Sequence, residues 1–426
     1  MRAPKVWQGG VLLMACNFLV ALGNYAFQGV IGRQLPLVEY GYANAAAGAV
    51  LLLSLPVMAS SNALTHYVAR FRASGQEAEL QGLVSSTRKW LGLVAGSGFV
   101  LALLLTQPLA TYCGFPRPSL VVAMVVNMTA MLGIAFVTAL CTGMGWYARL
   151  GLIAVGGMIV KLVSVWTVTR GMPLAEGAVA ATAASAGVYA VILFWWKDVS
   201  GAGERINPLN REFGLFALAA LASAFGSFAF TQSDILMAQR NLPAEAVGYF
   251  CAAGVFARGM LGLTGPLLMV FFATRSAGAK HASDSRTYFI LIGLYLLIMS
   301  LGAIAITVLR EPLTHSIFGR PEPAAAALVG RFALLILAIG AIEILGSWAL
   351  ASRWFGVVHA QFGLGVLYVA VGLVFGTDPS RLLSALLAAA TTVLAVLLGI
   401  CVICARRTRP LEGSTFPRPP LQPLTP

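Results

Sequence analysis

Two cations fall inside long apolar stretches of the sequence, where a charge is costly. Lys161 and Arg258 each lie roughly ten residues into an expected helix, so at about 1.5 Å per residue both are expected near the middle of a membrane. A cation at that depth needs an acid or an anionic ligand as its partner. Cations from two halves of a protein would suit a pyrophosphate group. The alternative is a structural ion pair, for which Glu343 is the first candidate.

Polar residues also recur at helical spacing on two expected faces, which hold Asn17, Asn24 and Gln28 in one helix and Ser223, Ser227, Thr231 and Asp234 in another. Such faces could line an aqueous cavity and bond sugar hydroxyls, or could bond helices to each other. The candidate substrate-binding residues are therefore Lys161, Arg258, Asn24, Gln28, Ser227 and Thr231. Asp234 and Glu343 are the candidates for ion coupling or for a structural ion pair.

The composition indicates an integral membrane protein. Of the 426 residues, 59% are hydrophobic and only 10% are charged, whereas soluble domains carry about 25% charged residues. The net charge of +13 does not point to nucleic acid, because Lys and Arg gather in alternate loops. That bias predicts cytoplasmic N- and C-termini.

Hydropathy predicts an all-α protein with about twelve membrane helices. The expected ranges are 9–31, 42–68, 90–107, 119–145, 151–169, 177–196, 213–236, 246–272, 287–309, 326–351, 359–375 and 381–404. The expected domains are an N-terminal six-helix lobe over 1–205 and a C-terminal six-helix lobe over 206–405. Residues 406–426 are basic and proline-rich, which is typical of a disordered cytoplasmic tail.

An internal repeat supports the two lobes. The segment Arg33-x-Leu35-Pro36-x4-Gly41-Tyr42-x2-Ala45-Ala46 recurs without a gap as Arg240-x-Leu242-Pro243-x4-Gly248-Tyr249-x2-Ala252-Ala253. Each copy joins the first and second helices of one lobe. Six helices per lobe leave both lobes in the same orientation, related by an axis along the membrane normal. This is the architecture of an alternating-access transporter.

Several functions are disfavoured by what the sequence lacks. The first six expected helices hold no Asp or Glu, which argues against capture of cationic drugs and against ion coupling in that lobe. No G-x-x-x-x-G-K-[ST] phosphate loop is present. The cysteines show no disulfide-framework spacing, the histidines have no metal-ligand spacing, and the expected loops are too short for a catalytic domain. We therefore expect no cofactor, no metal and no enzymatic activity.

The repeated junctions also carry a family resemblance. Gly32-Arg33-x-Leu35-Pro36-x4-Gly41-Tyr42, followed by Arg70-Phe71-Arg72-Ala73-Ser74-Gly75, resembles the opening of the polysaccharide biosynthesis flippases. These belong to the multidrug/oligosaccharidyl-lipid/polysaccharide exporter (MOP) superfamily. Ser233-Asp234-Ile235-Leu236-Met237, running into the second copy of the repeat, resembles their seventh and eighth helices. The lipid II flippases of that superfamily have two more helices than expected here, and its drug-extruding branch has an acid in the first helix. Both differences favour the O-antigen or exopolysaccharide branch.

The resemblance implies a V-shaped fold like that of the multidrug and toxic compound extrusion (MATE) transporters. It also implies flipping of a lipid-pyrophosphate-linked oligosaccharide across a bacterial inner membrane, for surface polysaccharide or lipopolysaccharide synthesis. The implied partners are the lipid-linked oligosaccharide, membrane lipids and other polysaccharide assembly proteins. Two alternatives stay open. One is an ion-coupled multidrug or metabolite exporter of the same fold. The other is a non-transporting subunit of a polysaccharide synthase complex.

Overall fold

The computed structural model describes residues 3–195, 211–276, 285–351 and 354–407. Within these ranges the chain is helical, without strands, and its helices in order are α1 Ala3–Gln34, α2 Leu37–Ala73, α3 Glu77–Leu104, α4 Thr106–Cys113, α5 Pro118–Gly143, α6 Tyr147–Gly171, α7 Ala175–Trp195, α8 Arg211–Thr231, α9 Ser233–Asn241, α10 Ala244–Ser276, α11 Ser285–Val308, α12 Arg310–Phe318, α13 Pro323–Ala351, α14 Phe355–Phe375 and α15 Pro379–Arg407.

Each of the twelve predicted helices corresponds to one of these helices or to a consecutive pair. The predicted seventh helix is divided into α8 and α9, whereas α4 and α12 follow the third and ninth predicted helices and lie almost wholly outside the predicted ranges. The long loop expected between Arg70 and Lys89 is wrong, because α2 continues to Ala73 and α3 begins at Glu77. Two acidic residues in the first turn of α3, Glu77 and Glu79, favour this early start by interacting with the helix dipole.

The helices are suited to crossing a membrane. Seven of those described are long and apolar enough to do so alone, and an eighth span is formed if α11 and α12, bent by 74° at their junction, are counted together. Large apolar side chains such as Leu104, Val308 and Val374 are more than two-thirds exposed. Such a surface is stable in hydrocarbon and not in water. The chain is therefore a multi-pass membrane protein.

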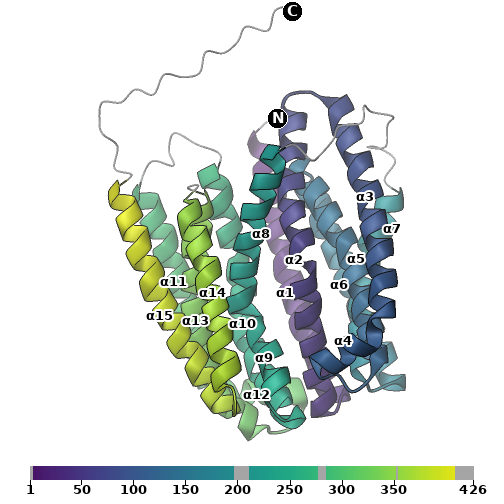
Figure 1. Ribbon diagram of the computed structural model, residues 1–426, viewed down its shortest axis with the longest axis vertical. Coiled ribbons are helices and arrows are strands. Elements are labelled where there is room, and N and C mark those ends of the chain that lie inside the picture. The colour runs from purple at the N-terminus through teal and green to yellow at the C-terminus, as the bar shows by residue number, and fades with distance from the viewer. Residues whose placement is uncertain (1–2, 196–210, 277–284, 352–353, 408–426) are drawn as a thin grey trace, which may run out of the picture.

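The helices form two halves that lie side by side (Figure 1). In the first half, α1–α7, the main pairings are α2 with α5, α5 with α7 and α1 with α6. In the second half, α8–α15, they are α10 with α13, α8 with α14 and α13 with α15. Contacts between the halves come mainly from α2 against α8 and α10, with smaller contributions from α2 against α9 and from α1 against α12 and α10. We call the end that holds α4, α9 and α12 the distal end; α1 begins at the opposite end (Figure 1).

The two halves share the same local features, a break after the third helix and a short helix that ends at a glycine. Their third helices break at Leu105 and Leu309, which have nearly identical backbone angles (φ −96° and −91°). The short helices that follow both end at a glycine, Gly114 or Gly319, with φ near +67°, a conformation that glycine adopts without strain. The two-fold repeat therefore extends beyond the sequence motif that predicted it.

The repeated motif lies where the halves meet. Gly41 of α2 faces Gly248 of α10, its equivalent in the other half, so closely that a Cβ on Gly41 would lie 3.1 Å from the Gly248 nitrogen. The alanines of the motif (Ala45, Ala46, Ala252 and Ala253) are fully buried. Small residues let the two helix backbones approach closely. The repeat thus specifies a helix crossing.

Side-chain hydrogen bonds join the halves near this crossing, one of them between the Tyr25 and Ser316 hydroxyls at 3.4 Å. Arg33 Nη2 of α1 donates to the carbonyl oxygen of Ser316 in α12 at 2.8 Å. Gln239 Nε2 of α9 donates to the carbonyl oxygen of Gly114, just after α4, at 3.3 Å. The short helix α12 of the second half is therefore bonded to α1, the first helix of the first half. The end of the short helix α4 of the first half is bonded to α9, which continues α8, the first helix of the second half. The halves are closed on each other at the distal end.

A charged cluster fastens the distal end of the first half. Arg117, which precedes α5, contacts Glu39 of α2 at 2.6 Å and Glu176 of α7 at 2.7 Å. Ser119 Oγ also donates to Glu176 at 2.7 Å. The hydrogen bonds to Glu39 and Glu176 raise the pKa of Arg117 above its ordinary value, so the guanidinium stays charged. The N-terminal ends of α2, α5 and α7 are thereby held together.

The predicted domain boundary at residue 205/206 lies outside the described residues, as do residues 408–426 of the predicted tail. Both stay predictions. Arg406 and Arg407, assigned to the tail, are the last residues of α15.

Candidate functional site

Lys161 lies in α6 and contacts the facing side of α1. Its Nζ donates to Asn24 Oδ1 at 3.0 Å and lies 3.9 Å from the centre of the Phe27 ring. Neither partner carries a charge. The ring face offers partial negative charge to an ammonium group, and the amide oxygen accepts one of its three N–H donors. Within the described residues no carboxylate contacts Lys161, so its positive charge is not neutralised by the protein.

Asn24 and Gln28, predicted to share one helical face, turn to different partners. Asn24 is exposed and bonded to Lys161. Gln28 Nε2 donates to Asn44 Oδ1 of α2 at 3.2 Å, and its Oε1 accepts from the Tyr40 hydroxyl at 2.9 Å. Gln28 thus bonds α1 to α2, as in the interhelical interpretation of these residues. Asn24 remains at the surface beside the cation.

Arg258 has an acid partner. Its guanidinium forms a salt bridge with Asp234, and both side chains are largely buried, with 13% and 3% exposed. The structure therefore pairs Arg258 with Asp234 and not with Glu343, the candidate named from the sequence. The charge is compensated within the second half, so this cation differs from Lys161 in its availability to a ligand.

The Arg258–Asp234 pair lies at a break in the seventh helix. The continuous helix predicted over 213–236 is wrong: α8 ends at Thr231, Gln232 has non-helical angles, and α9 begins at Ser233. Arg258 Nε donates to the Thr231 carbonyl oxygen at 3.4 Å, and Asp234 accepts from the Ile235 N–H at 2.9 Å. A cation thus lies at the negative end of α8 and an anion at the positive end of α9, which stabilises both helix ends.

A second polar cluster lies inside the second half. Ser227 Oγ of α8 donates to Glu343 Oε2 of α13 at 2.9 Å. The other carboxylate oxygen, Oε1, is buried and has no hydrogen-bond partner. Gln361 of α14 is 2% exposed and its Oε1 is also unpartnered. Burying an oxygen without a hydrogen-bond donor is energetically costly. A proton or a cation bound at these two oxygens would remove that cost.

The eight predicted site residues thus separate into three places. Lys161 and Asn24 lie at the α1–α6 contact, Gln28 lies at the α1–α2 contact, and the remaining five lie in the second half. Thr231 donates only to the Ser227 carbonyl of its own helix. No described contact joins Lys161 to Arg258. Sequence reasoning missed the helix break, for which Ser233 and Asp234, typical residues of a helix start, were the available signal.

No model of a known protein family matches the sequence, and no curated protein matches it. Solved structures do match its fold. The lipid II flippase MurJ in an inward closed conformation aligns with a TM-score of 0.71 at 11% identity, covering 94% of this chain and 88% of that one. An inward-facing MATE multidrug resistance transporter of the MOP superfamily aligns with a TM-score of 0.63 at 14% identity, covering 94% and 100%.

A eukaryotic MATE transporter aligns with a TM-score of 0.62 at 14% identity, covering 94% of this chain and 96% of that one. At such identities the likeness concerns the fold alone. The chain has the polytopic, all-α fold of the MATE transporters and of MurJ.

Proposed function

We propose that this protein translocates a lipid-pyrophosphate-linked oligosaccharide across a bacterial inner membrane, by alternating access between its two halves. The observation that carries the proposal is Lys161, a cation in a membrane-spanning helix whose described partners are an amide and an aromatic ring. A charge so placed is expensive unless it serves a ligand. The fold, shared with transporters and with a lipid flippase, supports movement of that ligand across the membrane.

The pairing of Arg258 with Asp234 changes the expected binding mode. A pyrophosphate held equally by two cations would require Arg258 to leave a buried carboxylate, which costs several kcal/mol. We assign the anionic group to Lys161, with Asn24 beside it as a further hydrogen-bonding group. Arg258 has the structural role of joining α8, α9 and α10.

Glu343 is the proposed coupling group. Its buried Oε1 has no partner, while Oε2 is held by Ser227. Binding of a proton or a cation would give the buried Oε1 a partner, and release of that ion would leave Oε1 without a partner again, which is energetically unfavourable. The first half, which binds the anion in this proposal, has no such group on α1 or α6. Substrate binding and ion coupling are thereby assigned to different halves.

The first experiment measures lipid-linked glycans by mass spectrometry in cells that lack the gene. Accumulation of one lipid-pyrophosphate oligosaccharide, reversed by the wild-type protein, is the expected result. Lys161→Gln should fail to reverse it at normal membrane abundance, whereas Lys161→Arg should restore most of the flux because it keeps the charge. Arg170→Gln, on the same helix and stacked on Trp166, is the matched control and should act as wild type. An unchanged glycan pool in the deletion strain would refute the proposal.

A second experiment supplies Lys161 with an acid. Counted along the repeat, Phe27 is the equivalent of Asp234, so one position provides an aromatic ring in the first half and a carboxylate in the second. Phe27→Asp should neutralise Lys161 and abolish translocation, while Phe27→Asn, of the same size without the charge, should retain more activity. Equal activity in both variants would show that an uncompensated Lys161 is not needed.

The buried carboxyl of Glu343 also favours a second candidate, an ion-coupled exporter of the same fold. Transport of a dye or metabolite driven by a proton or sodium gradient, with no effect on lipid-linked glycans, would support it. Co-purification with a glycosyltransferase and no transport by the isolated protein would instead indicate a synthase subunit. Cytoplasmic termini, predicted from the Lys and Arg distribution, belong to the same proposal and can be tested with terminal reporter fusions.

A further inference from the structure

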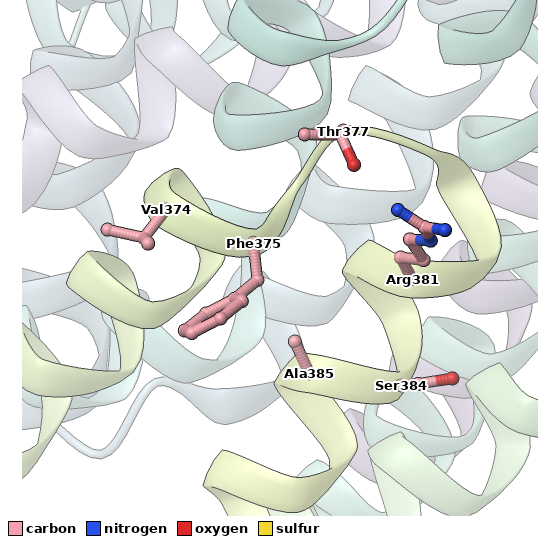
Figure 2. Close-up of a pocket in the computed structure, with 6 residues that line it drawn as sticks. All are labelled: Val374, Phe375, Thr377, Arg381, Ser384 and Ala385. Carbon is pink, nitrogen blue, oxygen red and sulfur yellow. The ribbon is translucent and has the colours of Figure 1, made fainter.

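A hollow at the distal end of the second half combines an apolar wall with a cation. It has a volume of about 410 Å³ and lies between the end of α14 and the start of α15, lined by Val374, Phe375, Thr377, Arg381, Ser384 and Ala385. Figure 2 shows the Arg381 guanidinium on the side of the connecting loop near Thr377, while Phe375 and Val374 lie on the other side. We call this feature the α14–α15 groove.

The apolar wall of the groove lies at a membrane boundary. Val374 and Phe375 are 69% and 59% exposed and are the last residues of the candidate span Gly356–Phe375. The next candidate span begins at Pro379. Apolar side chains at the end of a membrane-crossing helix contact acyl chains, whereas the loop beyond them reaches the headgroups. The groove therefore extends from hydrocarbon to headgroup level.

Arg381 is available to a ligand. It is exposed and, within the described residues, forms no salt bridge. The nearby Asp378 carboxylate instead accepts the backbone N–H groups of Ser380 and Arg381, at 3.0 Å and 3.2 Å. A second cation is close, because Arg331 of α13 is also exposed and donates to Ser380 Oγ. Two guanidinium groups thus lie at the start of α15.

The first half shows a charge near the start of its last helix that is neutralised within the chain. There Glu176, the second residue of α7, is held by Arg117. The residue equivalent to Arg117 is Glu322, and it is engaged by Arg320 at 2.7 Å. Near the start of α15, by contrast, Arg381 has no acid partner within the described residues.

We propose that the α14–α15 groove binds an anionic phospholipid of the distal leaflet, with its phosphate at Arg381 and an acyl chain against Phe375 and Val374. A guanidinium binds phosphate oxygens through paired N–H donors, and the exposed apolar wall suits a chain attached to that phosphate. The groove shares no residue with the contacts of Lys161, so we assign it to a membrane lipid and not to the proposed transport substrate.

Native mass spectrometry of the purified full-length protein tests this proposal, with phosphatidylglycerol and phosphatidylcholine as the probes. Wild-type protein should prefer phosphatidylglycerol, and Arg381→Gln should weaken that binding about fivefold, as expected for one cation at a lipid surface. Arg320→Gln, an exposed arginine already paired with Glu322, is the matched control and should leave lipid binding unchanged.

Three outcomes would overturn the assignment. The first is an unchanged phosphatidylglycerol affinity in Arg381→Gln, and the second is equal binding of phosphatidylcholine by wild type. The third is displacement of the lipid by millimolar inorganic phosphate, which would mean that the groove is a site for free anions. Because Lys161→Gln retains Arg381, it should bind phosphatidylglycerol normally, so failure of the translocation proposal and failure of the lipid proposal give different results.

Discussion

Adding one methyl group at the Gly41–Gly248 crossing should open the distal end. A Cβ on Gly248 would lie 2.5 Å from the carbonyl oxygen of Leu37. Restoring ordinary contact requires α2 and α10 to separate by about 0.9 Å, because neither atom is the end of a flexible side chain. Overpacking of this kind costs about 1–3 kcal/mol. Since the cost applies only while the halves are closed, it should shift the equilibrium toward the distally open state by about 5–150-fold.

A native cysteine can report this shift. Cys251 follows Gly248 on α10 and is fully buried in the closed arrangement. In a variant that keeps Cys251 as its only cysteine, its reaction with a membrane-impermeant maleimide measures how often the distal end opens. Gly248→Ala should accelerate labelling, within the range calculated above. Gly41→Ala should have a smaller effect, because its Cβ would meet its nearest neighbour at 3.1 Å.

Gly259→Ala is the matched control, since it lies on the same helix and has nothing within 4 Å of the added Cβ. It should leave the labelling rate unchanged. Alanine favours a helix over glycine by about 1 kcal/mol, so unfolding is not expected in any of the three variants, and size-exclusion chromatography checks this. Equal labelling of Gly248→Ala and Gly259→Ala would refute the assignment of this crossing as the point of closure.

Two other substitutions test the ion pairs. Arg117→Met should lower the melting temperature in detergent, because it leaves Glu39 and Glu176 without their cation; Arg117 is partly exposed, so we expect a loss of about 1–2 kcal/mol, the lower range for hydrogen bonds to charged groups. A smaller loss is expected for Arg320→Met, whose pair is exposed. Asp234→Asn should also destabilise the protein, by leaving Arg258 buried without an acid; the double variant with Arg258→Gln should recover part of the loss in the same melting assay.

The sequence was sufficient to predict the all-α membrane fold and the repeat, because apolar runs of membrane length and matched glycines are local signals. It was insufficient for the breaks. Leu105 and Leu309 are ordinary helix formers, and only the following Pro108 and Pro312, together with Gly114 and Gly319, mark the short helices α4 and α12. Hydropathy averages over a window longer than these helices, so it does not resolve them, and the predicted ranges end at 107 and 309.

The candidate site was predicted less well, for a physical reason. Depth in the membrane can be counted along a helix, so the positions of Lys161 and Arg258 within their helices were accessible from the sequence. The partner of each cation depends on which helices pack together, which periodicity does not specify. Arg258 meets Asp234 because α10 packs against α9 after the break at Gln232, and a continuous seventh helix would have directed Asp234 elsewhere.

Comparison of the halves separates residues that the backbone requires from residues that are free to change. Gly41 and Gly248, Gly114 and Gly319, and the helix-starting Trp146 and Trp354 are the same in both halves. The glycines serve the main chain, through a close approach or a left-handed conformation.

The charged residues follow the opposite rule. Arg117 in the first half corresponds to Glu322 in the second, each three residues after the glycine that ends the short helix, and Phe27 corresponds to Asp234. The fold tolerates reversal or loss of charge at these places, so the charges are not needed to specify it. Lys161 and Arg381, which have no acid partner within the described residues, are therefore the positions where a ligand from outside the chain is most expected.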